Sequence, residues 1–117
     1  MRPDARDASY LLDMVEAAER VRSYVSNATF AQYEESSLLR DAVERNVVVM
    51  GEAAKKVSEA FRREHPEIPW RKMAVLRNVL AHEYGAISNS EIWEVATMRM
   101  NAFIQALKPL IPPPPED

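Results

Sequence analysis

The chain has 117 residues, almost half of them apolar, which suits one domain with a sizeable core and leaves no room for a second. Its net charge is −3 and it has no cysteine, so composition excludes disulfides and cysteine metal sites, counts against a protein that coats nucleic acid, and suits a reducing cytoplasm. No segment resembles a signal peptide, and none approaches the roughly 20 apolar residues of a membrane span.

The first predicted helix runs from about Asp4 to Val25, and the segment after it, "SNATF", predicts a short turn with Asn27 and Thr29 as cap candidates. The second helix is predicted to begin after the serines at 36 and 37 and to continue to about Arg63. Their apolar stripes have helical spacing. The stripe residues are Leu11, Met14, Val15, Ala18, Val21 and Val25 in the first helix, and Leu39, Val43, Val47, Met50, Ala54, Val57 and Phe61 in the second.

The centre of the second predicted helix, "VVVM" at 47–50, is apolar on all sides and therefore predicts contact with more than one neighbour. Gly51 follows it directly. A glycine inside a helix costs about 1 kcal/mol relative to alanine. Close approach of another helix backbone would offset that cost, and we adopt this as a hypothesis.

Two prolines in "HPEIP" (65–69) end the helical pattern, and Pro69 is well placed to begin a third helix over 69–84, with Gly85 as its stop. Ser88 or Ser90 is predicted to cap the fourth helix, whose core candidates are Ile92, Val95, Ala96, Phe103, Ile104 and Leu107. The prediction is an all-α, antiparallel bundle of four to five helices in a single domain over 1–110, followed by a disordered proline-rich tail over 111–117.

The stretch "RNVLAHEYG" (77–85) places polar residues in an otherwise core-forming helix. On a helical wheel His82 lies away from the apolar arc, beside Asn78, so it is not a core histidine. Arg77 is five residues from His82, roughly 140° around the helix, and shares an edge with Tyr84. Its position alone leaves open whether His82 has a catalytic role or is an exposed residue without one.

Arginine and histidine around a phosphate form a plausible set for RNA cleavage. The histidine would move protons to or from the 2′-hydroxyl or the leaving oxygen, and the arginine would stabilise charge on phosphorus. This chemistry needs no metal or other cofactor, and the sequence has no convincing set of metal ligands: its two histidines are far apart and no paired acidic motif occurs.

Other polar and aromatic residues receive structural interpretations. A basic cluster falls in one third of the chain, and by itself a solvated helix face is its favoured interpretation: Lys55, Lys56, Arg62, Arg63, Arg71 and Lys72. Asn46 is either buried with a partner, which we favour, or turned towards the active groove. His65 is interpreted as structural, and Trp70 and Trp93 as packed in the core or in a dimer interface.

"RNVLAHEY" resembles the motif of arginine, four residues, histidine, any residue and tyrosine in the HepT-like branch of the HEPN superfamily. The resemblance extends over "AVERNVVVMGEAAKKVSEAF" (42–61), "HPEIPWRKMAVLRNVLAHEYGAIS" (65–88) and "EIW" (91–93), nearly the whole chain. One departure is Gly85, where many relatives have an aromatic residue, and this bears on the shape of the tyrosine site.

The resemblance implies a prokaryotic, cytoplasmic, homodimeric ribonuclease toxin whose partner is a small nucleotidyltransferase antitoxin, with tRNA among the candidate substrates. It implies that Arg77 and His82 of both protomers meet at the dimer interface as the catalytic pair. It also implies that Asn78 supports them, and that transfer of AMP onto Tyr84 silences the toxin.

Two readings of other classes stay open at this point. One is a non-catalytic helical partner that binds and positions a nucleotidyltransferase, which the acidic charge and the offset between Arg77 and His82 favour. The other is a nucleotide-binding helical dimer without turnover.

Overall fold

The computed structural model describes residues 2–82 and 87–113, and over these ranges all regular secondary structure is helical, which confirms the predicted fold class. Within these ranges the structure has seven α-helices, with a π-helical segment before the last of them and a 3₁₀ turn after it. In chain order they are α1 (Ala5–Val25), α2 (Phe30–Glu35), α3 (Ser37–Lys56), α4 (Glu59–Glu64), α5 (Trp70–His82), α6 (Asn89–Glu94), the π-helical segment (Val95–Arg99), α7 (Met100–Leu107) and the 3₁₀ turn (Lys108–Leu110).

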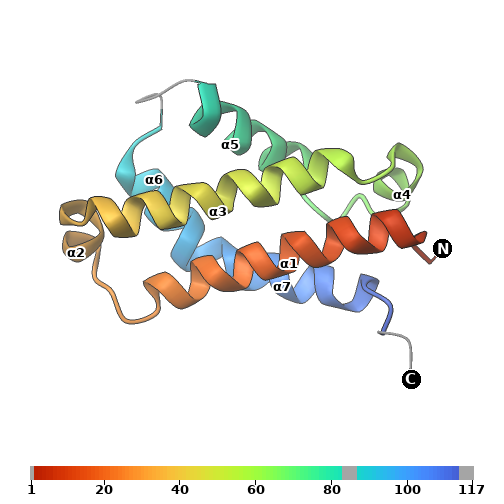
Figure 1. The fold of residues 1–117 in the computed structure, drawn as a ribbon, viewed down its shortest axis with the longest axis horizontal. Helices are drawn as coiled ribbons and strands as arrows, with labels where there is room; N and C mark the ends of the chain where they lie inside the picture. The colour runs from red at the N-terminus through yellow and green to blue at the C-terminus, as the bar shows by residue number, and fades with distance from the viewer. Residues whose placement is uncertain (1, 83–86, 114–117) are drawn as a thin grey trace.

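The long helices lie side by side, each antiparallel to the next (Figure 1). α3 packs between α1 on one side and α5 on the other, and α7 packs on the far side of α1. α6, the π-helical segment and α7 form one continuous rod that returns beneath α1. None of the helices that the structure describes is long and apolar enough to cross a membrane.

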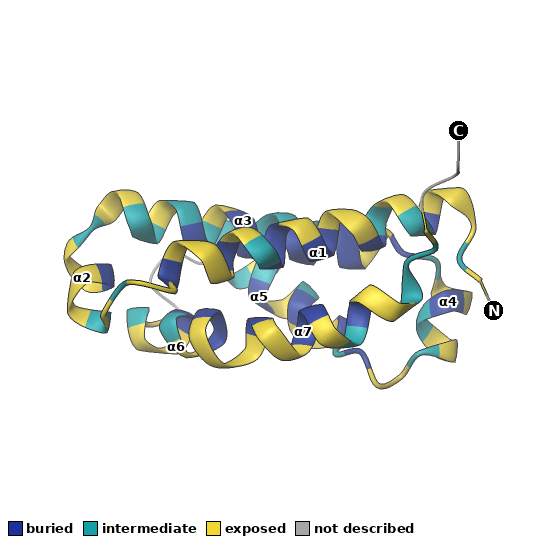
Figure 2. Ribbon diagram, turned by 90° about the horizontal axis from the view of Figure 1, so that it is seen from below, coloured by how far each residue is buried: buried dark blue, intermediate teal, exposed yellow. Residues whose placement is uncertain are grey.

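The core lies between these helices, and the outer faces are exposed (Figure 2). Every stripe residue predicted for the first helix is buried, and Asp4 caps α1 by accepting a hydrogen bond from Asp7 N at 2.7 Å. Within the second predicted stripe only Leu39 is less than fully buried. The apolar centre of α3 contacts both α1 and α5, which confirms the prediction of more than one neighbour.

The predicted turn at "SNATF" is confirmed over Ser26 and Asn27, with Thr29 as a cap, but the expectation of no helix between this turn and residue 36 is wrong, because the segment forms α2. Thr29 accepts a hydrogen bond from Gln32 N, and the Gln32 side chain accepts one from Thr29 N, which completes a capping box. Tyr33 of α2 is fully buried, with its ring centroid 5.3 Å from that of Trp93. A reciprocal cap and one buried aromatic side chain therefore stabilise a helix too short to show a hydrophobic period.

The predicted single helix from 37 to 63 is also wrong, because it breaks after Lys56. Val57 is extended, and Ser58 caps the separate helix α4. The cause is Asp7 of α1, a buried carboxylate that accepts hydrogen bonds from Ser58 N at 2.8 Å and from Ser58 Oγ at 2.6 Å. These two bonds satisfy the buried charge and draw the chain out of the helix.

Gly51 lies where α3 meets α5, as hypothesised. A Cβ atom built on it would lie 2.4 Å from Arg77 Cβ and 2.6 Å from the Met73 carbonyl oxygen. Both distances are shorter than van der Waals contact allows, and one atom belongs to backbone. Gly51 therefore permits the close approach that fixes Arg77 of α5 against α3.

The remaining helices begin close to their predicted positions. α5 starts at Trp70, one residue after the predicted Pro69, whose carbonyl accepts from Met73 N at 3.2 Å. Its predicted end at 84 and the stop at Gly85 lie outside the described residues. Ser88 caps α6 in a capping box with Glu91, and all predicted core residues of the fourth helix are buried.

Side chains that received structural interpretations have structural partners. Asn46 is 8% exposed, accepts from Arg20 Nε at 2.7 Å and donates to the Ala42 carbonyl at 2.8 Å. The His65 ring stacks on Phe61 at 4.4 Å, and Trp70 Nε1 donates to the His65 carbonyl at 2.9 Å. Trp93 packs on Phe30 and Tyr33. These contacts confirm the structural readings of Asn46, His65 and the two tryptophans.

Candidate active site

The candidate site lies on the last two turns of α5 that the structure describes, where the helix crosses α3. Arg77 is half-buried against Gly51, with its side chain 22% exposed, whereas Asn78 and His82 are exposed. The Arg77 side chain thus extends out of the contact between α3 and α5, and the Asn78 and His82 side chains lie at its edge. The sequence prediction that His82 is absent from the core face is confirmed.

The long arginine side chain removes the angular offset between Arg77 and His82. Arg77 Nη1 lies 3.1 Å from Asn78 Oδ1, to which it donates, and 3.3 Å from His82 Nε2. The structure therefore brings together three of the four residues named from the sequence. Tyr84, the fourth, lies outside the described residues.

The contact between Arg77 Nη1 and His82 Nε2 determines which nitrogen is the donor and which is the acceptor. A guanidinium only donates hydrogen bonds, so His82 Nε2 accepts. This hydrogen bond requires the tautomer whose Nε2 has a free lone pair and whose proton is on Nδ1. A neutral imidazole whose Nε2 lone pair points at a cation is the form that can take a proton from a substrate hydroxyl beside that cation.

Glu52 of α3 is a further member of the site, to which the sequence assigned no role. Its Oε1 lies 3.6 Å from Arg77 Nη2, and both side chains are partly exposed. An ion pair at this exposure contributes little to stability, but it orients the guanidinium through Nη2, while Nη1 contacts Asn78 and His82. In the sequence Glu52 is marked only by its position next to Gly51. The meaning of this position becomes clear once the contact between α3 and α5 is known.

An open depression of about 510 Å³ adjoins Glu52 between α3 and α5. Asp41, Glu44 and Arg45 of α3 line one wall of it, and Leu80 and Ala81 line the other. Burial raises the pKa of Glu44 above its ordinary value, and nearby Asp41 raises it further, while Arg40 opposes the shift. The site is thus cationic at Arg77 and bordered by carboxylates on α3.

The raised pKa of Glu44 predicts a pH dependence of stability. The folded state holds this proton more tightly than the unfolded state, so the free energy of unfolding should fall as the pH rises from about 4.5 through the raised pKa. Glu44→Gln should remove this fall and give a protein more stable than wild type at pH 7. Urea unfolding at several pH values measures it. Glu35→Gln, which changes an exposed carboxylate of α2, is the matched control and should reproduce the wild-type profile.

Within residues 2–82 and 87–113, no three histidine, aspartate or glutamate side chains come together as a group that could hold a metal ion. Among the described residues, this site brings together the Arg77 guanidinium, the His82 imidazole, the Asn78 amide and the Glu52 carboxylate. Together they can bind an anion, orient it and exchange a proton with it.

Comparison with known proteins assigns the chain to a family. Residues 14–110 match the family model described as ribonuclease HepT-like. A protein of Thermococcus cleftensis named "Probable ribonuclease HepT" is 35% identical over 85 residues, covering 73% of this chain and 77% of that protein. In Methanocaldococcus jannaschii, "Putative RNase MJ1380" is 30% identical, with 74% and 80% covered, and "Putative RNase MJ0127" is 29% identical, with 88% and 85% covered. No solved structure matches the chain.

Proposed function

Because the chain belongs to the ribonuclease HepT-like family, we propose that it is an endoribonuclease in which Arg77 and His82 cleave RNA without a metal ion. The observation that supports this most directly is the distance of 3.3 Å between Arg77 Nη1 and His82 Nε2. At this distance both side chains could contact one phosphate group, as the proposed general base and electrostatic stabiliser must. The names of the relatives support the activity class, and the geometry supports the residues.

The proposed reaction uses the 2′-hydroxyl of RNA as the nucleophile. The phosphate displaces His82 from Arg77, and His82 Nε2 takes the 2′-hydroxyl proton as the O2′–P bond forms. Arg77 stabilises the negative charge on the phosphoryl oxygens, and Glu52 and Asn78 hold its guanidinium in place. The P–O5′ bond breaks, and the leaving oxygen takes a proton from an acid. The products are a 2′,3′-cyclic phosphate and a 5′-hydroxyl.

A second copy of the chain is the proposed source of that acid. α5 packs chiefly against α3, and its outer face leaves Val75 49% exposed beside half-buried Val79. Covering this apolar face with the same face of another protomer would bring two copies of the site together. The second His82, protonated, would then serve as the acid.

We further propose that a nucleotidyltransferase antitoxin controls the site by transferring AMP onto Tyr84. This tyrosine follows His82 by two positions in the sequence. A phosphate attached there would compete with RNA for Arg77, because a guanidinium binds either anion in the same way. The adduct would therefore silence cleavage without unfolding the protein.

The test is cleavage of mixed cellular RNA, including tRNA, by protein produced without the partner, in excess EDTA. We expect cleavage with cyclic phosphate ends that EDTA leaves unchanged, and its loss after incubation with the nucleotidyltransferase and ATP. Intact mass should then show one AMP per chain. No cleavage by protein of unmodified mass would contradict the proposal, as would activity that EDTA abolishes.

One observation favours a second candidate function. Arg77 is already engaged by Asn78, Glu52 and His82, and the chain has a net charge of −3. A non-catalytic partner that binds a nucleotide or positions a nucleotidyltransferase would need no more than this. A positioning partner would form a stable complex with the transferase, and a nucleotide binder would unfold at a higher temperature when ATP is present. Neither would cleave RNA.

A further inference from the structure

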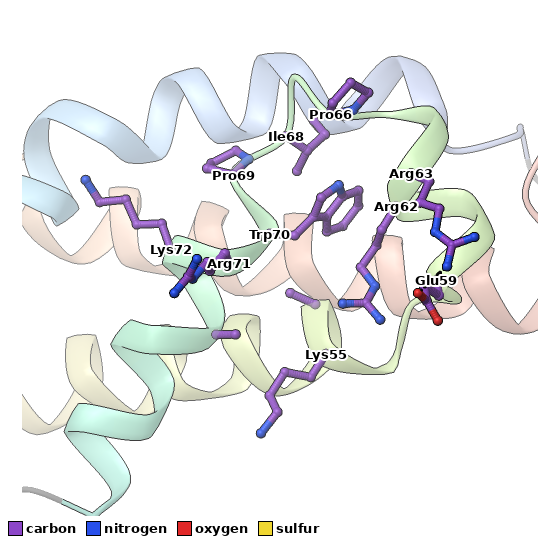
Figure 3. Close-up of a pocket in the computed structure, with 12 residues that line it drawn as sticks. Lys55, Glu59, Arg62, Arg63, Pro66, Ile68, Pro69, Trp70, Arg71 and Lys72 are labelled. Carbon is purple, nitrogen blue, oxygen red and sulfur yellow. Dashed lines mark hydrogen bonds and ion pairs between the residues drawn. The ribbon is translucent and has the colours of Figure 1, made fainter.

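A second concave site lies at the other end of α5 from His82. It is an open pocket of about 900 Å³ between the end of α3, α4, the following loop and the start of α5. Figure 3 shows Trp70 at its centre, with Arg62 on one side of the indole and Arg71 on the other, and Lys55 below. Ile68, Pro66 and Pro69 form the wall contributed by the loop.

The side chains around this pocket are mainly cationic. Lys55, Arg62, Arg63, Arg71 and Lys72 line it, with Glu59 as the one carboxylate, and Glu59 pairs with Arg63. Among the residues that the structure describes, Lys55, Arg71 and Lys72 have no carboxylate partner within salt-bridge distance, and Arg62 Nε is buried without a hydrogen-bond partner. In a protein with a net charge of −3, this concentration of unpaired positive charge predicts an anionic ligand.

The pocket is also held rigid. The Trp70 indole is fixed by its hydrogen bond to the His65 carbonyl and by an edge-on contact with Phe61 at 6.5 Å. Two prolines limit the backbone of the wall. A site whose walls are set before the ligand arrives loses less conformational entropy on binding. Cationic side chains that converge on a rigid concave surface fit the phosphate groups of a single nucleic-acid strand.

The direction of α5 connects this pocket to the candidate active site. Arg71, Val75, Asn78 and His82 follow one another at spacings of four, three and four residues, so they share one face of the helix. Arg71 and His82 are about three turns apart, roughly 17 Å along the axis. This span is about five nucleotides at a stacked rise of about 3.4 Å each.

We propose that this pocket binds the phosphate backbone of the RNA strand several nucleotides away from the bond that is cleaved at Arg77 and His82. This inference rests on the proposed ribonuclease function and adds to it a binding site for substrate. The enzyme would then bind the RNA phosphates through Arg71, Lys72 and Lys55, independently of base sequence. It would favour strands long enough to reach both this pocket and the candidate active site.

The test measures RNA binding apart from cleavage. In the His82→Ala background, fluorescence anisotropy follows binding of a labelled single-stranded RNA longer than the span between the two sites. Arg71→Gln/Lys72→Gln should weaken binding about tenfold and flatten its dependence on salt, as the loss of about two phosphate contacts requires. The matched control, Arg22→Gln/Arg99→Gln, removes the same charge from exposed residues outside the pocket and should bind as the parent does. Circular dichroism confirms that each variant is folded.

Several outcomes would overturn the assignment. Equal binding by the pocket variant and the control would show that no strand is held there. If the pocket variant instead lost thermal stabilisation by ATP while keeping its affinity for RNA, the pocket would hold a free nucleotide. Failure of wild type to cleave any RNA is a separate result: it would refute the proposed nuclease, whereas the pocket assignment would stand or fall on the binding data alone. With active enzyme, the loss of kcat/KM in the pocket variant should grow with substrate length.

Discussion

Replacing His82 with alanine should lower RNA cleavage by about 10²–10⁴-fold, the usual contribution of a general acid–base group, with no change in thermal unfolding. The imidazole is exposed, and Arg77 is the one partner that the described residues give it, so its removal leaves the core intact. The measurement is initial cleavage rate beside a melting curve. His65 is the matched control, since it is the other histidine of the chain and is packed on Phe61. His65→Ala should lower the melting temperature and leave the cleavage rate of the folded protein near that of wild type.

Substitution of Arg77 separates charge from geometry at the same site. Arg77→Lys keeps a positive charge but not the planar fork that spans Glu52, Asn78 and His82. We expect a loss of about 10²–10³-fold in kcat, similar to the loss of one stabilising group for an oxyanion. Cleavage that survived both Arg77→Lys and His82→Ala would assign the chemistry to other residues.

Gly51→Ala should destabilise the protein by roughly 1–3 kcal/mol, the usual cost of overpacking, although alanine is the better helix former by about 1 kcal/mol. The new methyl group would overlap Arg77 Cβ and the Met73 carbonyl, and a backbone carbonyl cannot swing aside as a flexible side chain can. α5 would have to move away from α3. Urea unfolding measures the change, and Gly51→Val should show a larger one.

The sign of the Gly51→Ala effect decides between two accounts of the glycine. A gain in stability would mean that helix propensity dominates and that α5 adjusts freely. A loss of stability accompanied by slower cleavage would show that the contact at Gly51 also places Arg77. If stability fell while cleavage by the folded fraction stayed the same, the contact would serve packing alone.

The sequence predicted those parts of the fold that depend on local pattern. The stripe of α1, the cap at Thr29 and the cap at Ser88 all arise within a few residues of the elements that they define. The break after Lys56 could not be predicted, because its cause is Asp7, which is 51 residues from Ser58 in the sequence. α2 was missed because six residues are too few to display a helical period.

The same distinction between local and distant causes holds at the candidate site. Arg77, Asn78 and His82 could be named because they lie within six positions of one another on one helix. Their closeness could not be derived from the helical wheel, which places Cβ atoms and not the end of a long side chain. Glu52 and the basic pocket needed the packing of α3 and α4 against α5. The cluster interpreted as a solvated face, apart from Lys56, could therefore be recognised as a concave surface only from the structure.

The π-helical segment Val95–Arg99 has a consequence for changes in chain length. Buried residues on its rod recur at steps of four, at Ile92, Ala96 and Met100, whereas an α-helix turns fully every 3.6 residues and would drift by about 80° over those eight positions. The wider π turn absorbs this drift, as though one residue had been inserted into an α-helix, with the 74% exposed Met98 on its outer side. Losing one residue here therefore leaves the inward faces of α6 and α7 in phase. Elsewhere on the rod the same change would rotate every later side chain by about 100° and bring polar groups into the core.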